Sequence, residues 1–168
     1  VKGDKIIIEV YVPGEIFQDS RINISKIIHD FTDLLKFHSN TTTDRNDCNI
    51  NVACSVADPF QDQVNPVMLM TMGGGSCSAS LINNVEEDLT PYVLTAQHCL
   101  GGNASNYNFY FKYQSNNCNG SSGSYSYSMS GAYLRSEGNG PDFALLELSN
   151  NVPESYDPFY NGWSRNTN

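Results

Sequence analysis

From residue 48 onward, short apolar runs alternate with breaks rich in glycine, asparagine and serine. The breaks contain the residues that end strands and form turns. Six short runs separated in this way predict an all-β fold, an antiparallel barrel or sandwich. Inside the fifth run, small polar and larger residues alternate, which favours an exposed hairpin over a binding surface. The predicted strands are residues 66–72, 77–82, 92–96, 107–113, 124–133 and 143–148.

The pattern before residue 48 is different. A dense β-branched run at 5–12, ended by Pro13 and Gly14, predicts a strand and a turn. Apolar residues at 24–35 recur at helical spacing, although the β-branched residues at 22–28 also fit a strand, so both alternatives stay open. The polar stretch that follows has no period, which indicates a linker or a processing region.

Composition and charge narrow the class of protein. The chain of 168 residues has 16% charged and 39% apolar residues, with ten Tyr and eight Phe, which favours a folded over a disordered chain. Residues 48–168 carry three basic and ten acidic side chains, too few cations to neutralise nucleic acid or an anionic membrane surface. No apolar run is long enough to span a bilayer. We therefore expect neither nucleic acid nor membrane as a partner.

Five cysteines, at positions 48, 54, 77, 99 and 118, indicate the compartment. They contain no Cys-x-x-Cys pair, so they do not predict a zinc ribbon or a thioredoxin site. Wide spacing in a chain of low charge is typical of extracellular disulfides, and the odd number leaves one cysteine without a partner here. The histidines are scattered, and the acidic run 86–88 is expected to be solvated, with a weak calcium site as the alternative. We expect no metal centre and no cofactor.

His98 is the first candidate for chemistry. The predicted strand 92–96 leads directly to it, and Cys99 follows, with Cys77 on the preceding strand. A bond between the two cysteines would hold the histidine backbone in place, as a general base requires. The alternative is a histidine that simply lies at the surface after a strand.

Asp142 is the second candidate, because it lies at the start of the strongly apolar run 143–148. A carboxylate that is partly buried must be paired or hydrogen-bonded. Pairing with a histidine ring nitrogen would meet this need and would fix the tautomer of the histidine. An ordinary turn aspartate is the alternative.

Taken together, these motifs resemble a known family. Thr-Ala-x-His-Cys, followed by Asp-Phe-Ala-Leu-Leu-x-Leu, is similar to the histidine and aspartate motifs of chymotrypsin-like serine proteases, whose chain order is His, Asp, Ser. The whole set, in its order and spacing, resembles the bacterial lysyl endopeptidases more narrowly. The residues that carry the resemblance are 48–52, 75–84, 91–99, 142–148 and 162–165.

The resemblance implies a fold and a set of site residues. Residues 46–168 would be the first, six-stranded antiparallel barrel of a double barrel, and residues 1–45 the tail of a prosegment. His98 would be the general base and acid, and Asp142 its orienting partner. The implied disulfides are Cys77–Cys99 and Cys54–Cys118. Cys48, unpaired here, would bond to a cysteine in the C-terminal half of the protease.

One element of the family pattern is missing from the sequence. The nucleophilic serine of the family lies in a Gly-x-Ser-Gly motif in the second barrel, and no such motif follows Asp142. The letters at 120–123 match, but they precede Asp142 and lie in low-complexity sequence, so we reject them. We expect the complete protein to be a secreted serine endopeptidase, made as a zymogen, that cuts protein or peptide substrates after lysine. The chain alone would be inactive without the missing C-terminal half.

Two further interpretations stay open. A non-catalytic secreted β-domain, either a pseudoprotease or a carbohydrate- or protein-binding module, is the alternative to the protease. Within residues 48–168, Lys112 is the only lysine. A protease that cuts after lysine would gain from having few such sites, although the low charge of this segment explains the same number without any function.

Overall fold

A computed structural model describes residues 50–120 and 123–165. The strand predicted at 5–12, the helix or strand predicted between 22 and 35, and Cys48 lie outside the described residues. In the described part, one antiparallel sheet of seven strands runs in the order β5-β4-β1-β2-β3-β7-β6. The all-β prediction is therefore confirmed. The strands are β1 (Val67–Met72), β2 (Gly75–Ile82), β3 (Tyr92–Thr95), β4 (Asn108–Phe111), β5 (Tyr127–Ser130), β6 (Ala132–Gly138) and β7 (Phe143–Leu148).

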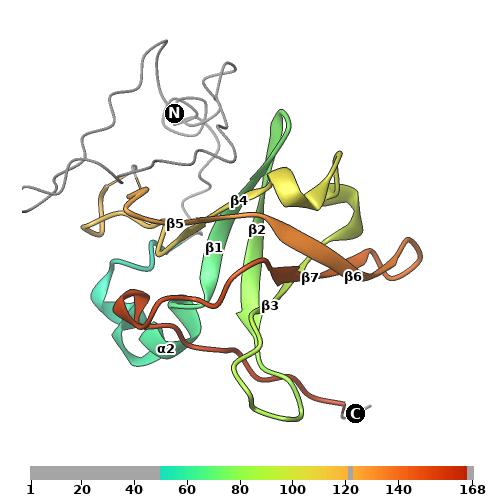
Figure 1. The fold of residues 1–168 in the computed structure, drawn as a ribbon. Helices are drawn as coiled ribbons and strands as arrows, with labels where there is room; N and C mark the ends of the chain where they lie inside the picture. The colour runs from blue at the N-terminus through green and yellow to red at the C-terminus, as the bar shows by residue number, and fades with distance from the viewer. Residues whose placement is uncertain (1–49, 121–122, 166–168) are drawn as a thin grey trace, which may run out of the picture.

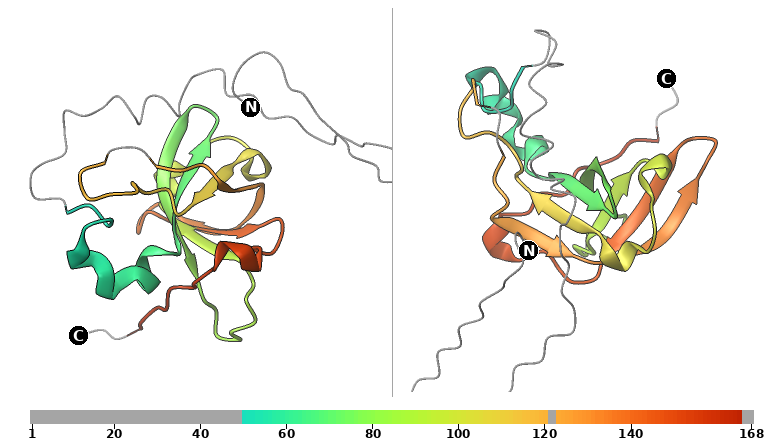
Figure 2. Two further views of the ribbon diagram at one scale, coloured as in Figure 1. Left: turned by 90° about the vertical axis from the view of Figure 1, so that its left-hand side faces the viewer. Right: turned by 90° about the horizontal axis from the view of Figure 1, so that it is seen from above.

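The sheet is curled rather than flat. The strands β5 and β6 lie at its opposite ends, yet only Gly131 separates them in the sequence. The sheet must therefore bend round until its two edges approach each other at this residue, which gives the barrel-like shape seen in Figures 1 and 2. Gly131 has a φ of +87°, and a Cβ there would lie 2.9 Å from Oγ of Ser149, so glycine suits this corner.

The structure has seven strands where the sequence predicted six, because one predicted run belongs to two strands. The run predicted at 124–133 contains all of β5 and the beginning of β6, with the glycine corner between them. The rest of β6 continues into exposed polar residues and has a bulge between Leu134 and Ser136. At the bulge, Arg135 Nε donates to Glu147 Oε2 on β7 at 2.7 Å.

The core lies inside the curl. Alternate residues of β4 and β7 point inward, whereas β1, in the middle of the sheet, is buried along nearly its whole length. Two adjacent glycines with positive φ, Gly73 and Gly74, make the tight turn between β1 and β2. The largest fully buried side chains are Tyr107, Phe109, Met68, Met70, Leu81, Leu146 and Val93.

Short helical segments surround the sheet. A 3-10 helix, η1 (Ser55–Phe60), and one turn of α-helix, α2 (Gln61–Val64), precede β1, and the apolar pattern had not predicted them. The other 3-10 turns are η2 (Gln97–Cys99), η3 (Ala104–Asn106) and η4 (Glu154–Tyr156). Within the described ranges, no helix has the length and apolar character needed to cross a membrane.

Candidate active site

The pairing of β3 with β7 brings the two candidate residues together. Thr95, the last residue of β3, lies opposite Ala144 at the start of β7. The chain therefore leaves β3 toward His98 at the same end of the sheet at which it enters β7 from Asp142. Residues that are 44 positions apart in the sequence meet because of this register.

The position of His98 is fixed by the short turn η2. The side chain of Thr95 donates to the carbonyl of Ser78 on β2 at 3.0 Å, which ties the end of β3 to its neighbour. Cys99 is buried and forms a disulfide with Cys77 of β2. The backbone is thus held on both sides of His98, while the His98 side chain itself is 70% exposed.

Both carboxylate oxygens of Asp142 contact His98. The backbone N–H of His98 donates to Oδ1 at 3.0 Å, and ring Nδ1 lies 2.7 Å from Oδ2. Asp142 has a φ of +52°, a left-handed conformation that few residues other than glycine adopt. Backbone strain of this kind persists only where the surroundings hold it, and here the surrounding contacts aim the carboxylate at the histidine.

The electrostatics of the pair follow from these contacts. The hydrogen bond from the His98 backbone N–H, followed by the one from its ring, lowers the pKa of Asp142 below its usual value. Asp142 is therefore ionised at neutral pH and can only accept hydrogen bonds. In the neutral imidazole, Nδ1 then carries the hydrogen, and Nε2 keeps its lone pair free to accept a proton. Because both side chains are well exposed, the pair contributes orientation rather than stability.

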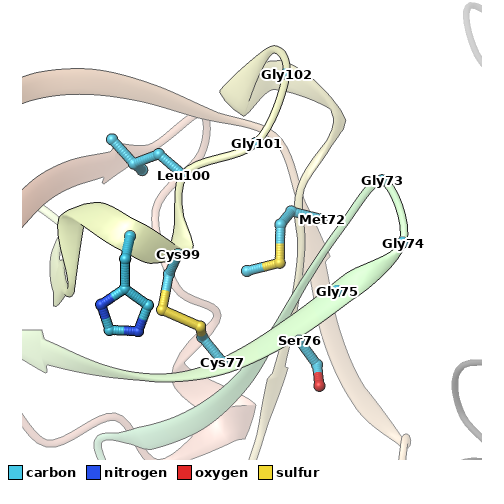
Figure 3. Close-up of a pocket in the computed structure, with 11 residues that line it drawn as sticks. Met72, Gly73, Gly74, Gly75, Ser76, Cys77, Cys99, Leu100, Gly101 and Gly102 are labelled. Atoms are coloured by element: carbon cyan, nitrogen blue, oxygen red, sulfur yellow. A yellow bond between two sulfur atoms is a disulfide. The ribbon is translucent and has the colours of Figure 1, made fainter.

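A hollow of about 630 Å³ lies next to His98. Figure 3 shows the Cys77–Cys99 disulfide beside it, the glycine turn Gly73–Gly75 on one side, and Gly101 with Gly102 on the other. Met72 and Leu100 add apolar surface, and the glycine rim has no side chains that would obstruct entry. The hollow therefore leaves open space directly beside the histidine.

The same place contains a group of possible metal ligands, Cys77, His98 and Cys99, whose ligand atoms lie within 4.8 Å of one another. Metal ions bind cysteine as the thiolate. The two sulfur atoms are bonded to each other, so they are not thiolates. The chemistry of this corner is therefore that of a held imidazole and not that of a metal centre.

The structure joins Cys54 to Cys118 as the second disulfide. This bond ties the segment before η1 to the loop that follows β4. Both disulfide pairs are thus the pairs that the family resemblance implies. Cys48 lies outside the described residues, so its pairing and the boundary at residue 45 stay predictions.

Two features of the site were not predicted from the sequence. The glycine run 73–75 indicated only a break between strands, whereas in the structure it forms the rim of the hollow beside His98. The second hydrogen bond to Asp142, from the His98 backbone, has no signal in the sequence, because it depends on how the turn η2 faces the start of β7.

A comparison with known families identifies the family of this chain. The family model described as the C-terminal domain of lysyl endopeptidase matches residues 42–168. The match covers about three quarters of the chain and includes every residue of the site. The protein is thus a protease family member, and the chain belongs to the lysyl endopeptidase family through its C-terminal domain.

Proposed function

We infer that this chain contributes the proton-transferring part of a serine endopeptidase that cuts peptide bonds after lysine. The observation that carries this proposal is the contact of one ionised carboxylate with both the backbone and the ring of His98. A binding module has no need of a histidine whose ring is paired with a carboxylate and whose side chain is 70% exposed. A general base needs both features.

In the proposed reaction, His98 Nε2 takes the proton of a serine hydroxyl as the serine oxygen bonds to the substrate carbonyl carbon. The tetrahedral intermediate then collapses, the carbon–nitrogen bond breaks, and the proton passes from Nε2 to the leaving amine. Water repeats the sequence on the acyl-enzyme and releases the acid. Throughout, Asp142 keeps the ring in position and stabilises its protonated form.

The proposed reaction also needs groups that this chain does not supply. The serine, the N–H groups that bind the oxyanion, and the pocket that selects lysine lie on sequence outside residues 1–168. The hollow between Met72 and Gly102 receives the part of the substrate that follows the cleaved bond, because His98 must protonate the amine of that part. Two disulfides fit secretion into an oxidising compartment, and residues 1–45 would be prosegment.

The test uses the protein expressed from its complete gene and a set of peptides that differ only in the residue before the cleaved bond. We expect cleavage after lysine in preference to arginine and leucine. The variant His98→Ala should lower kcat/KM on the order of 10⁴-fold or more. Asp88→Asn is a matched control, because this carboxylate also accepts several hydrogen bonds but lies in the loop between β2 and β3. Full activity of His98→Ala would refute the proposal.

A further inference from the structure

We propose that the fold protects the peptide bond between Lys112 and Tyr113 from lysine-specific endopeptidases, including the complete form of this protein. The proposal rests on the function inferred above, in which cleavage follows lysine. The chain contains four other lysines, all within residues 1–48, so Lys112 is the one target in the protease domain. The low charge of the domain explains why lysines are few, but it does not explain the conformation of this one.

The backbone of Lys112 is in a conformation that a protease cannot use. The residue follows the end of β4 and has a φ of +50°, in the left-handed region. Its carbonyl oxygen accepts a hydrogen bond from the N–H of Gln114 at 2.8 Å. A substrate must be extended for attack, with its carbonyl free for the oxyanion donors. The bond can therefore react only after this turn has opened and the backbone has rotated.

The lysine side chain is engaged as well. Its ammonium nitrogen lies 3.7 Å from Oδ2 of Asp157 and 5.7 Å from the centre of the Tyr127 ring. The side chain is only 24% exposed. A lysine-selective pocket would have to bind this same charge, and it cannot do so until the lysine leaves the carboxylate and the ring.

The residue after the bond is also held in place. The Tyr113 ring lies directly against Gly123, where a Cβ would come within 2.6 Å of the ring. The Tyr113 hydroxyl is 3.0 Å from that of Tyr125, and the two ring centres are 4.9 Å apart. Both sides of the peptide bond are thus fixed by residues distant in sequence.

Release of Lys112 requires more than a loop movement. Just before it, β4 pairs with β1 on one side and with β5 on the other. Tyr156 of η4 contacts the rings of Phe111 and Tyr127, and its hydroxyl donates to the carbonyl of Ser128. Cleavage of a folded protein follows the population of the locally opened form. These contacts keep that population small.

The experiment uses the complete protein with His98→Ala, so that it does not cut itself. A lysine-specific endopeptidase of established specificity is added under native conditions with the disulfides intact. Mass spectrometry follows cleavage after Lys112 and compares it with a linear peptide of residues 106–117. We expect the native bond to be cut roughly 100-fold more slowly than the peptide.

Variants identify the contacts responsible. Tyr127→Ser, which removes the ring beneath the ammonium and the contact with Tyr156, should accelerate native cleavage about tenfold. Asp157→Asn should accelerate it only about threefold, because Asp157 itself is 84% exposed and contributes little to holding the lysine. Glu154→Gln is the matched control, since it removes an exposed negative charge on the neighbouring turn, and it should have no effect. A melting curve establishes that each variant is folded.

Two results would overturn the proposal. One is equal cleavage of the native bond and the linear peptide. The other is a Tyr127→Ser rate no higher than that of Glu154→Gln. The added protease is known to cut after lysine. The measured cleavage after Lys112 therefore does not depend on the specificity of this protein. If the complete protein shows no preference for lysine, the proposed function fails, whereas the protection of Lys112 can still be measured.

Discussion

Two corners of the molecule, one at His98 and one at Lys112, each combine a left-handed backbone residue with a pair of contacting polar side chains. At the His98 corner, Asp142 has a left-handed backbone, and its carboxylate contacts the ring of His98. At the Lys112 corner, Lys112 has a left-handed backbone and pairs with a carboxylate, Asp157. The first corner leaves the imidazole 70% exposed, while the second leaves the lysine side chain 24% exposed.

The difference comes from what surrounds each pair. The His98 corner is held by backbone groups and a disulfide, which fix the position of the ring without covering it. At the Lys112 corner, the Tyr127 ring lies over the ammonium group, and the ring of the next residue in the sequence, Tyr113, packs against that of Tyr125. The His98 side chain therefore stays exposed, whereas the Lys112 side chain is partly covered by an aromatic ring and a carboxylate.

The largest expected contrast is between the two carboxylates. In the complete protein, Asp142→Asn should lower kcat on the order of 10⁴-fold, because an amide in this position favours the wrong histidine tautomer. Asp157→Asn should leave kcat unchanged, since among the described residues the Asp157 side chain is paired with Lys112 and not with His98. Steady-state kinetics on one lysine peptide measures both variants. Similar losses of kcat for Asp142→Asn and Asp157→Asn would show that the two carboxylates do not differ in role.

The next contrast is between the two disulfides. Cys77–Cys99 closes a loop with a sequence separation of 22, and Cys54–Cys118 one of 64. The chain-entropy model gives about 3 kcal/mol for the shorter loop and about 4 kcal/mol for the longer one. Replacing each pair by alanines should therefore destabilise the protein slightly more at Cys54–Cys118.

Activity should show the reverse order for the disulfides. Only the loss of Cys77–Cys99 frees the backbone beside His98, so this variant should also lose kcat. Denaturant unfolding and steady-state kinetics separate the two effects. Equal kcat values for the two folded double variants would contradict the role given to the Cys77–Cys99 bond.

A smaller effect is expected at the end of β3. Thr95→Val keeps the shape of the side chain but leaves the carbonyl of Ser78 without its donor. Loss of this partly buried hydrogen bond should lower the free energy of unfolding by about 1–2 kcal/mol. Thr90→Val is the control, because the Thr90 hydroxyl donates to an exposed carboxylate. Chemical denaturation compares the two, and an unaltered midpoint for Thr95→Val would show that the hydrogen bond contributes nothing.

The smallest effect concerns the pKa of Asp142. The backbone N–H of His98 is the main cause of the lowered pKa, and this group remains in His98→Ala. The carboxyl should therefore still titrate below 3.8 in that variant, as measured by carbon NMR. Because the folded pKa of Asp142 lies below the unfolded value of 3.8, the small contribution of this exposed carboxylate to stability is complete only above about pH 5 and is lost as the pH falls through the folded value. A return to 3.8 in His98→Ala would assign the shift to the ring instead.

Much of the fold follows from the pattern of apolar residues. Strands β7 and β1 are buried on one or both faces. Their apolar residues therefore predict a strand even when the neighbouring strands are unknown. The strand β6 is less predictable, because it lies at the edge of the sheet and most of its residues are exposed. The helical segment at Ser55–Val64 also lacks an apolar stripe and contains Pro59.

The site could be predicted only in part. The motifs around His98 and Asp142 nominate the residues, and the register of β3 and β7 explains why they meet. The sequence gives little signal for the left-handed backbone of Asp142 or of Lys112, because residues other than glycine adopt this conformation uncommonly. The exposure of His98 and the partial burial of Lys112 are thus determined by tertiary packing.

In the function proposed above, His98 activates a serine supplied by sequence outside residues 1–168. Its most direct test is to treat the complete protein with an aryl sulfonyl fluoride and to identify the modified residue by mass spectrometry. We expect that a single serine beyond residue 168 is labelled, and that His98→Ala abolishes its labelling. Labelling of a serine within residues 1–168, or equal labelling with and without His98, would contradict the account.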